Sequence, residues 1–405
     1  MPPRNHFGYG LPGSVRHIAS MGEKSDMSDT SSIAARRGFL TAGVAAATAT
    51  AVLATPGVSR AQTVTLRFQS TWPQRDIFHE FAQDYVSRVN AMGGGRLRLE
   101  LLAAGSVVGA FQVLDAVHAG TLDGGHGVSA YWFGRNKAFS LFGTTPPWFG
   151  DAHQLLGWFY YGGGEALYRK LMHDTLRMNA VGFLTGPMPT QPLGWFRNPI
   201  ERADQIRGLR YRTVGLATDL MQEMGAAVVA LPGGEIVPAL ERGVIDAAEF
   251  NNPSSDRLLG FPDVAKNYYI QSYHQAVECF EILFNRGKFD ALPDEHKALL
   301  RHSAEASSAD MSWKLQDRYS NDMLAMSQQQ QVNVRPTPTP ILDAQLAAWN
   351  RVIERLEGDN SNPNNGPLFK EICDSQRAWC RRVGNFFLRY QVSPVRSYNH
   401  FFARG

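Results

Sequence analysis

The sequence predicts an α/β fold with much parallel sheet, divided between more than one domain-sized unit. Segments that alternate apolar and polar residues, as strands do, are followed by segments with the apolar spacing of helices. This strand-then-helix order recurs along the chain and favours parallel β-α-β units. The 405 residues are also enough for two or three domains, each with its own core.

In the first half of the chain, the expected elements alternate between strand and helix. Trp72-Pro73 ends the first strand, Asp76 begins the helix after it, and Gly93 ends that helix. The expected elements are a strand over 63–69, a helix over 77–92, a strand over 96–102 and a helix over 110–120.

The same alternation resumes after residue 180. Gly243 closes a short helix there, and an Asn/Pro stretch over 359–366 separates the last helical segment from the one before it. The expected elements are strands over 180–185 and 193–196, a stretch over 206–213 that leads into a helix over 218–224, a helix over 236–241, a strand over 245–250, and helices over 291–330, 341–358 and 369–388.

Charge and hydropathy exclude two broad classes of protein. Residues 1–61 hold six basic and three acidic side chains. Removing these from the 40 basic and 37 acidic side chains of the whole chain leaves 34 of each sign. A body without net charge does not fit a nucleic-acid partner. The mean hydropathy of −0.25 does not fit a polytopic membrane protein.

The three cysteines are expected to be buried, unpaired thiols. Cys373 and Cys380 are seven residues apart in an expected helix. That spacing is about 10 Å along the axis, which is too far for a disulfide. Cys279 stands alone and no Cys-x-x-Cys pair occurs, so neither a zinc ribbon nor a redox dithiol is indicated.

Residues 34–61 have the three parts of an export signal. Arg36-Arg37 form the charged part near their start, a weakly apolar Ala/Thr-rich stretch follows, and small residues end the segment at Ala61. Two arginines followed by Phe-Leu resemble a bacterial twin-arginine signal peptide, which predicts export to the periplasm. Residues 1–33 are interpreted as a leader or as the product of a start codon set too early.

The motifs of common enzyme classes are absent from the sequence. It has no Gly-x-Ser-x-Gly and no His-Glu-x-x-His. His118 and His126 lie on different expected elements, so they are interpreted as core or surface histidines rather than zinc ligands. No pair of a base and its orienting group is visible, so an enzyme is not favoured. The alternative left open is a secreted metal-dependent lyase or hydrolase with Glu249 as its base.

Three polar residues stand out between residues 188 and 285. Gln191 lies at a strand edge, Arg212 ends the string Gly208-Leu-Arg-Tyr-Arg212, and Glu249 ends a strand. Amide and carboxylate oxygens are ligands that Na⁺ and Ca²⁺ prefer. An arginine can hold a carboxylate through two parallel hydrogen bonds. From spacing alone, the simpler interpretation is that Arg212 and Glu249 pair with each other or with solvent.

Longer strings in this region resemble the periplasmic substrate-binding proteins of TRAP transporters. They are Gly-Leu-Arg-Tyr-Arg212-Thr and the string from Met224 to Phe250, with shorter matches at 104–105, 112–121 and 284–286. The resemblance covers most of residues 63–390 and is closest to the 2-oxo-acid-binding branch. It implies a two-lobed periplasmic binding protein fold, with strands that cross between the lobes and helices at the C-terminal end.

The resemblance also implies roles for five residues. Arg212 would clamp the substrate carboxylate, and Gln191 would reach both substrate and metal. Glu249 and the backbone carbonyl of Phe250 would be metal ligands. Gln275 falls where this branch has a glutamate ligand, so the site has one negative charge fewer.

Charge balance favours a monovalent cation in such a site. Arg212 and Glu249 cancel, so Na⁺ and a monocarboxylate would leave the site neutral, and burying unbalanced charge is costly. A sodium ion is therefore expected, with calcium as the alternative. Gln275 is expected to shift the site toward Na⁺ or to weaken metal binding. The resemblance places Trp72, Tyr131 and Trp132 on the pocket wall.

The resemblance implies the organisation and function of the whole chain. Lobe 1 is expected over 62–187 with part of 284–405, lobe 2 over 188–283, and the remainder of 284–405 as C-terminal helices that form homodimers in some relatives. The expected function is capture of a small 2-oxo or 2-hydroxy acid in the periplasm for delivery to a membrane-embedded TRAP permease, without catalysis. An aromatic, amino or sugar acid is the alternative ligand.

Overall fold

The computed structural model describes residues 63–359, 366–390 and 393–401. The expected leader over 1–33 and signal peptide over 34–61 lie outside these ranges, so both stay predictions. Within the described ranges, no helix combines the length and the apolar character that crossing a bilayer requires.

The described strands form two sheets. The first sheet has the order β2-β1-β3-β10-β4, and the second has the order β11-β9-β5-β8-β6-β7. The strands of the first sheet are β1 (Val64–Ser70), β2 (Leu97–Leu102), β3 (Gly124–Gly127), β4 (Ala180–Met188) and β10 (Glu278–Asn285). Those of the second sheet are β5 (Gly194–Phe196), β6 (Arg210–Arg212), β7 (Ala227–Val229), β8 (Ala247–Ala248), β9 (Asn267–Tyr269) and β11 (Asn333–Arg335).

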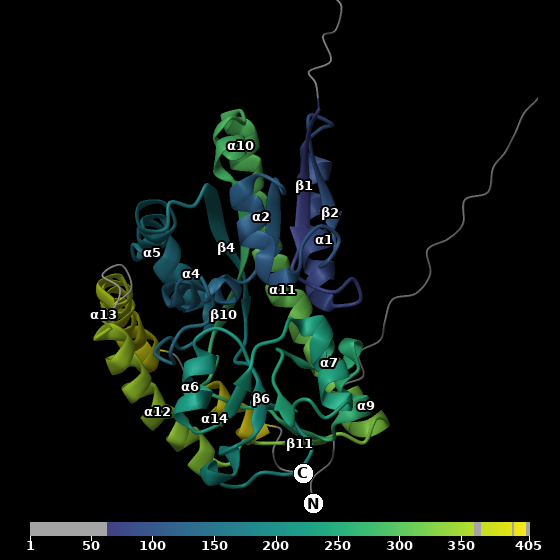
Figure 1. Cartoon of the computed structure of the whole chain (residues 1–405), viewed down its shortest axis with the longest axis vertical. Helices are drawn as coiled ribbons and strands as arrows, with labels where there is room; N and C mark the ends of the chain where they lie inside the picture. Colours follow the sequence, from purple (N-terminus) through teal and green to yellow (C-terminus); the bar gives the residue numbers. More distant parts are fainter. Residues whose placement is uncertain (1–62, 360–365, 391–392, 402–405) are drawn as a thin grey trace, which may run out of the picture. The chain divides into compact units, whose positions relative to one another are not determined.

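Helices cover both sheets (Figure 1). The α-helices are α1 (Ile77–Met92), α2 (Val113–Ala119), α3 (Ser140–Gly143), α4 (Ala152–Tyr161), α5 (Gly164–Arg169), α6 (Ala217–Glu223), α7 (Gly233–Glu241), α8 (Pro253–Leu259), α9 (Phe261–Val264), α10 (Arg286–Asp290), α11 (Asp294–Gln329), α12 (Thr339–Glu357), α13 (Gly366–Tyr390) and α14 (Pro394–Phe401). Short 3₁₀ turns lie between them, of which η2 (Ser129–Trp132) bears on the site.

The α/β fold class is confirmed, although the sheets are mixed. Strands β1, β2 and β3 are mutually parallel, and so are β6, β7 and β8. Strand β10 runs antiparallel to both of its neighbours, β3 and β4. The alternation rule missed β10 because each of its residues is buried, so the strand shows no polar face.

The expected helix after Asp76 illustrates how the local sequence sets an element. The carboxylate of Asp76 accepts a hydrogen bond from the backbone N–H of Phe78 and so caps α1. Seven residues of α1 face the core, from Ile77 to Val89. Gly93 caps the end of this helix, and the position needs glycine because a Cβ there would lie 2.4 Å from the carbonyl oxygen of Leu97.

Two connecting segments carry the chain between the sheets and lie beside each other. One joins β4 to β5, and the other joins β9 to β10. The backbone N–H of Gln191 donates to the carbonyl of Gln275 at 3.1 Å, and the hydroxyl of Thr190 donates to the carbonyl of Ala276 at 2.8 Å. The two segments therefore form one crossing, on which two of the predicted site residues lie.

The strands do not follow the expected lobe limits everywhere. Residues 278–283 fall in the range expected for lobe 2, yet they belong to β10 of the first sheet. Strand β11 falls in the range expected to return to lobe 1, yet it pairs with β9 of the second sheet. The physical reason is that the chain crosses back before Glu278, and α11 then carries it toward the second sheet again. The limits of the lobes stay a prediction.

Candidate functional site

Arg212 and Glu249 lie next to each other at the end of two parallel strands. Strand β6 ends at Arg212, which is in register with Ala248 of β8, and Glu249 follows directly. The side chain of Arg212 is 1% exposed and that of Glu249 is 0% exposed. The expectation that these two groups meet in an enclosed place rather than on separate outer surfaces agrees with this geometry.

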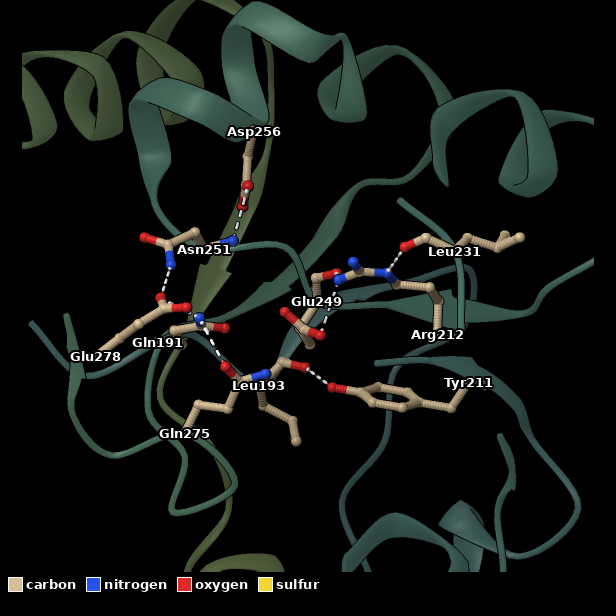
Figure 2. Close-up of polar contacts among 10 residues, drawn as sticks. All are labelled: Gln191, Leu193, Tyr211, Arg212, Leu231, Glu249, Asn251, Asp256, Gln275 and Glu278. Carbon is tan, nitrogen blue, oxygen red and sulfur yellow. Dashed lines mark hydrogen bonds and ion pairs between the residues drawn. The ribbon is translucent and has the colours of Figure 1, made fainter. Parts of the chain in front are cut away.

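Most of the donors of Arg212 are used to hold its side chain in place. Its Nε donates to the carbonyl of Leu231 at 2.8 Å (Figure 2). Its Nη1 donates to the carboxylate of Glu249 at 2.9 Å and to the backbone carbonyl of the same residue at 3.0 Å. Its Nη2 is buried and has no hydrogen-bond partner. The guanidinium therefore presents one nitrogen to a ligand, rather than the two that the sequence suggested.

Glu249 has one carboxylate oxygen in the ion pair and one without a partner. Oε1 accepts from Arg212, whereas Oε2 is buried and forms no hydrogen bond. Burial raises the pKa of Glu249 to about 7, and the positive charge of Arg212 counteracts part of this rise. The two residues do form the pair that spacing alone favoured. Each nevertheless keeps one polar atom without a partner, the Nη2 of Arg212 and the Oε2 of Glu249.

Gln191 and Gln275 also meet, and a second carboxylate joins them. The Nε2 of Gln191 donates to the Oε1 of Gln275 at 3.0 Å and to the Oε2 of Glu278 at 2.6 Å. The Oε1 of Gln191 and the Nε2 of Gln275 are buried without partners. Figure 2 shows these amides on one side of Glu249 and Arg212 on the other.

Glu278 is a site residue that the sequence reasoning missed. It is 5% exposed and accepts hydrogen bonds from the side-chain amides of Gln191 and Asn251. Burial and the nearby charge of Glu249 raise the pKa of Glu278 to about 8, although the hydrogen bonds from Gln191 and Asn251 lower it in part. The available signal was an acidic residue inside the apolar run from Val277 to Phe284.

His274 is a second residue near the site that the sequence did not single out. Its Nδ1 lies 2.6 Å from the hydroxyl of Ser272, and its Nε2 is buried without a partner. Burial and the positive charge of Arg212 lower the pKa of His274 to about 3. The imidazole is therefore neutral at physiological pH.

The predicted aromatic positions differ in what they contact. Tyr131 is buried, and burial together with Glu278 and Glu249 raises the pKa of its hydroxyl, which the charge of Arg212 lowers in part. Trp72 packs against Tyr131 at 5.5 Å between ring centres. Trp132 instead donates to the carboxylate of Glu281. Tyr131 and Trp132 also line a pocket of about 430 Å³.

His118 and His126 have ordinary structural partners. Nδ1 of His126 accepts a hydrogen bond from the indole of Trp72, and burial lowers the pKa of this imidazole to about 3. Nδ1 of His118 accepts from the backbone N–H of Asn179. Among the residues that the structure describes, no group of three or more His, Cys, Asp or Glu side chains is placed to hold a metal.

The free atoms of the site fit a hard cation better than a soft one. Glu249 offers a carboxylate oxygen and Gln191 an amide oxygen, both buried and without partners. Sodium and calcium prefer such oxygen ligands, whereas zinc sites use imidazole and thiolate groups. Phe250 follows Glu249, and its ring lies 5.7 Å from the guanidinium carbon of Arg212. The ligand roles of Gln191, Glu249, Phe250 and Gln275 stay predictions.

Contacts between elements of the two sheets enclose the site. The hydroxyl of Ser255 in α8 donates to the carboxylate of Asp76 at 2.5 Å, and Arg75 donates to the carbonyl of Leu259. The loop after Arg212 also packs closely, against residues of the first lobe. At Gly215 (φ +63°), a Cβ would lie 3.1 Å from both the Cβ of Ala130 and the hydroxyl of Ser140. The polar groups between the sheets are thus shielded from water.

This fold and site define a class of protein. Two α/β lobes built on separate sheets are joined by crossing segments, and unused polar atoms are buried at the crossing. That is the organisation of a two-lobed binding protein. The chain belongs to the bacterial extracellular solute-binding proteins, family 7, which matches residues 68–359. This family consists of transport proteins rather than enzymes, so the predicted family, fold and absence of catalysis are confirmed.

Two relatives are named as periplasmic binding proteins for organic acids. A monocarboxylate 2-oxoacid-binding periplasmic protein of Nostoc sp. is 35% identical over 235 residues, which are 58% of this chain and 64% of that protein. The match thus spans slightly less than two thirds of that relative. A 2,3-diketo-L-gulonate-binding periplasmic protein of Escherichia coli is 24% identical over 258 residues, 60% of this chain and 73% of that protein.

Solved structures of TRAP solute-binding proteins share the fold. A protein of Bordetella bronchiseptica with calcium and picolinate has a TM-score of 0.77 at 26% identity, over 84% of this chain and 98% of that one. A protein of Colwellia psychrerythraea with calcium and pyruvate has a TM-score of 0.75 at 26% identity, and one of Pseudoalteromonas atlantica with sodium and pyruvate has 0.75 at 25%. Both matches cover 84% of this chain and the whole of the other.

Proposed function

We propose that this chain captures a small 2-oxo or 2-hydroxy acid together with a cation. One observation carries the proposal: the buried Nη2 of Arg212 has no partner, and neither do the Oε2 of Glu249 and the Oε1 of Gln191. A positively charged donor suits a carboxylate, and oxygen acceptors suit a cation. The ligand thus completes contacts that the chain leaves open, which favours closure of the lobes around it.

Sodium is the proposed cation, with calcium as the alternative. In their ion pair Arg212 and Glu249 cancel, and Glu278, whose pKa burial raises to about 8, is the carboxyl of the two that takes up a proton more readily. Na⁺ and a monocarboxylate then leave the site neutral. If Glu278 is ionised, Ca²⁺ restores the same balance. Gln275, which has an amide in place of a carboxylate, favours the smaller charge.

The remaining assignments concern location and partners. We propose that the twin-arginine signal over 34–61 exports the chain to the periplasm, where it delivers its ligand to a TRAP permease. The exposed aromatic side chains of α13 and α14 support a homodimer through these helices: Phe386, Tyr390, Tyr398 and Phe401. An aromatic acid is the second ligand candidate, because the matched structure from Bordetella bronchiseptica holds picolinate.

Calorimetry with Arg212 variants tests the proposed function. Pyruvate and picolinate are titrated into the protein in sodium chloride, in calcium chloride, and in tetramethylammonium chloride after chelation. Wild type is expected to bind only with a metal cation present, and to melt at a higher temperature when ligand is bound. Arg212→Ala is expected to abolish this thermal shift.

Arg212→Lys separates ligand binding from folding. Lysine keeps the positive charge beside Glu249, but its single nitrogen leaves no counterpart of the free Nη2 of Arg212. The variant is expected to fold and to lose the ligand-induced shift. An undiminished shift in both variants would refute the proposed clamp, and binding that ignores the cation would refute the metal site.

A further inference from the structure

Glu278 joins three segments of the chain at the crossing between the sheets. Its Oε2 accepts from the Nε2 of Gln191, on the segment that leaves β4, at 2.6 Å. The same oxygen accepts from the Nδ2 of Asn251, two residues after Glu249. Glu278 itself begins β10 and forms an isolated antiparallel bridge with Thr144. One buried acceptor therefore ties the two segments that carry Gln191 and Glu249.

These contacts decide which end of the Gln191 amide faces the site. An amide has a donating nitrogen and an accepting oxygen of almost the same shape, so its orientation depends on its partners. The partners of Gln191 are the oxygens of Gln275 and Glu278. With the amide turned over, its oxygen would meet the acceptor atom of Glu278 instead, which is unfavourable.

Gln275 cannot fix this orientation by itself. Its own amide can also turn over, and its Nε2 has no partner that would oppose the change. Asn251 differs, because its Oδ1 accepts from Asn252 and thereby directs its Nδ2 to Glu278. Asn252 donates to Asn251, and Asn251 in turn donates to the Oε2 of Glu278. This oxygen is therefore an acceptor for Gln191 as well. Gln191 must then point its nitrogen toward that oxygen and leave its Oε1 free.

We infer that Glu278 is a positioning residue, which holds the amide of Gln191 so that its free oxygen faces the cation and ligand. The inference rests on the proposed function and deepens it. Glu278 acts through a hydrogen-bond acceptor rather than by binding the cation directly. Groups that orient metal ligands typically matter by about 10- to 100-fold in metal affinity.

Two substitutions of Glu278 distinguish positioning from charge. Glu278→Met removes the acceptor and keeps similar bulk, so the apparent affinity for Na⁺ or Ca²⁺ at fixed pyruvate is expected to fall about tenfold or more. Glu278→Gln keeps an oxygen where Oε2 lies, so its affinity is expected to stay within about threefold of wild type. Isothermal titration calorimetry measures both. An equal loss in the two variants would overturn positioning in favour of a direct role for the charge.

Glu281 provides a matched control on the same strand. It is another fully buried glutamate of β10, but its oxygens accept from Trp132 and Tyr168 rather than from a proposed cation ligand. Glu281→Met is expected to lower the melting temperature without changing the cation affinity of the folded protein. If Glu281→Met weakened binding as much as Glu278→Met, the effect would be one of general destabilisation, and the inference would be wrong.

Crystal structures without ligand test the inference independently of the proposed function. The Gln191 side chain is expected to keep its place in Glu278→Gln and to move or turn over in Glu278→Met. An unmoved Gln191 in Glu278→Met would overturn the inference, whatever the protein binds. Absence of pyruvate and picolinate binding by wild type would instead count against the proposed function alone.

Discussion

At the scale of single residues, the buried pair of Arg212 and Glu249 is costly unless both members are present. Each charge is almost completely removed from water, and the attraction between them offsets that cost only in part. The unused Nη2 and Oε2 atoms add to the cost in the free protein. A ligand and a cation that satisfy both atoms would recover some of it, which is why the pair suits a binding site better than a purely structural role.

Removal of Glu249 should therefore destabilise the free protein strongly. Glu249→Ala leaves the guanidinium buried without its counter-charge, and the free energy of unfolding is expected to fall by about 3–5 kcal/mol. Urea denaturation measures the change. The control is Asp246→Ala, which breaks the more exposed pair with Arg210 at the other ends of β6 and β8 and should cost about 1 kcal/mol. Similar losses in the two variants would contradict this account.

The residue scale also shows what sequence reasoning can reach. Arg212, Glu249, Gln191 and Gln275 were all singled out from the sequence, and the structure brings them together in two adjoining groups. Glu278 was not found, because its partners are 87 and 27 residues away along the chain and no local spacing reveals them. The sequence also could not predict that Arg212 has one free guanidinium nitrogen instead of two, because this depends on where the carbonyl of Leu231 lies.

At the scale of elements, β10 is a fully buried strand that nevertheless contains acidic residues. It lies between β3 and β4 and is buried on both faces, yet it includes two glutamates. Glu278 lies at the crossing, while Glu281 is held by the indole of Trp132 and the hydroxyl of Tyr168. Central strands usually contain apolar residues, so each of these carboxylates needs its own donors.

Glu281 should make the stability of the protein depend on pH. Burial raises its pKa from 4.5 to about 7, although the bonds from Tyr168 and Trp132 lower it in part. Because the folded value lies above the unfolded one, the contribution to stability is fully present below about pH 4.5 and is lost as the pH rises through about 7. The loss at higher pH is on the order of 3 kcal/mol.

Glu281→Gln isolates this contribution from those of other buried carboxylates. A glutamine stays neutral, so the free energy of unfolding of wild type relative to the variant should decline between pH 4.5 and 8. Urea denaturation at several pH values measures the difference. The exposed Glu295→Gln serves as a control for loss of a surface carboxylate. Parallel curves for wild type and Glu281→Gln would show that the carboxyl has no raised pKa.

At the scale of the whole molecule, the crossing segments place the site where both lobes can act on it. Arg212 and Glu249 come from the second sheet, Glu278 begins a strand of the first, and Gln191 and Gln275 lie on the connections between them. The two-lobed plan was predicted through the resemblance, since alternation alone suggested only α/β units. A strand as short as β8, which has two residues, shows no alternation of apolar and polar residues by which its limits could be predicted.

Closure should depend on contacts that lie away from the site itself. The hydroxyl of Ser255 in α8 donates to the buried carboxylate of Asp76, at the start of α1. Ser255→Ala removes this bond and leaves every proposed ligand group unchanged. One hydrogen bond to an acidic group contributes about 1–2 kcal/mol, so a less populated closed state should weaken pyruvate binding by up to about five- to thirtyfold. Calorimetry in the presence of Na⁺ measures the affinity.

Solution scattering then separates closure from damage to the fold. The ligand-free Ser255→Ala protein is expected to have a larger radius of gyration than ligand-free wild type, and saturating pyruvate with Na⁺ should bring the two values together. Ser312→Ala is the matched control, because that hydroxyl bonds only within its own helix, to the carbonyl of Ser308. If Ser312→Ala weakened binding equally, or if Ser255→Ala left both affinity and size unchanged, the contact between α8 and α1 would play no part in closure.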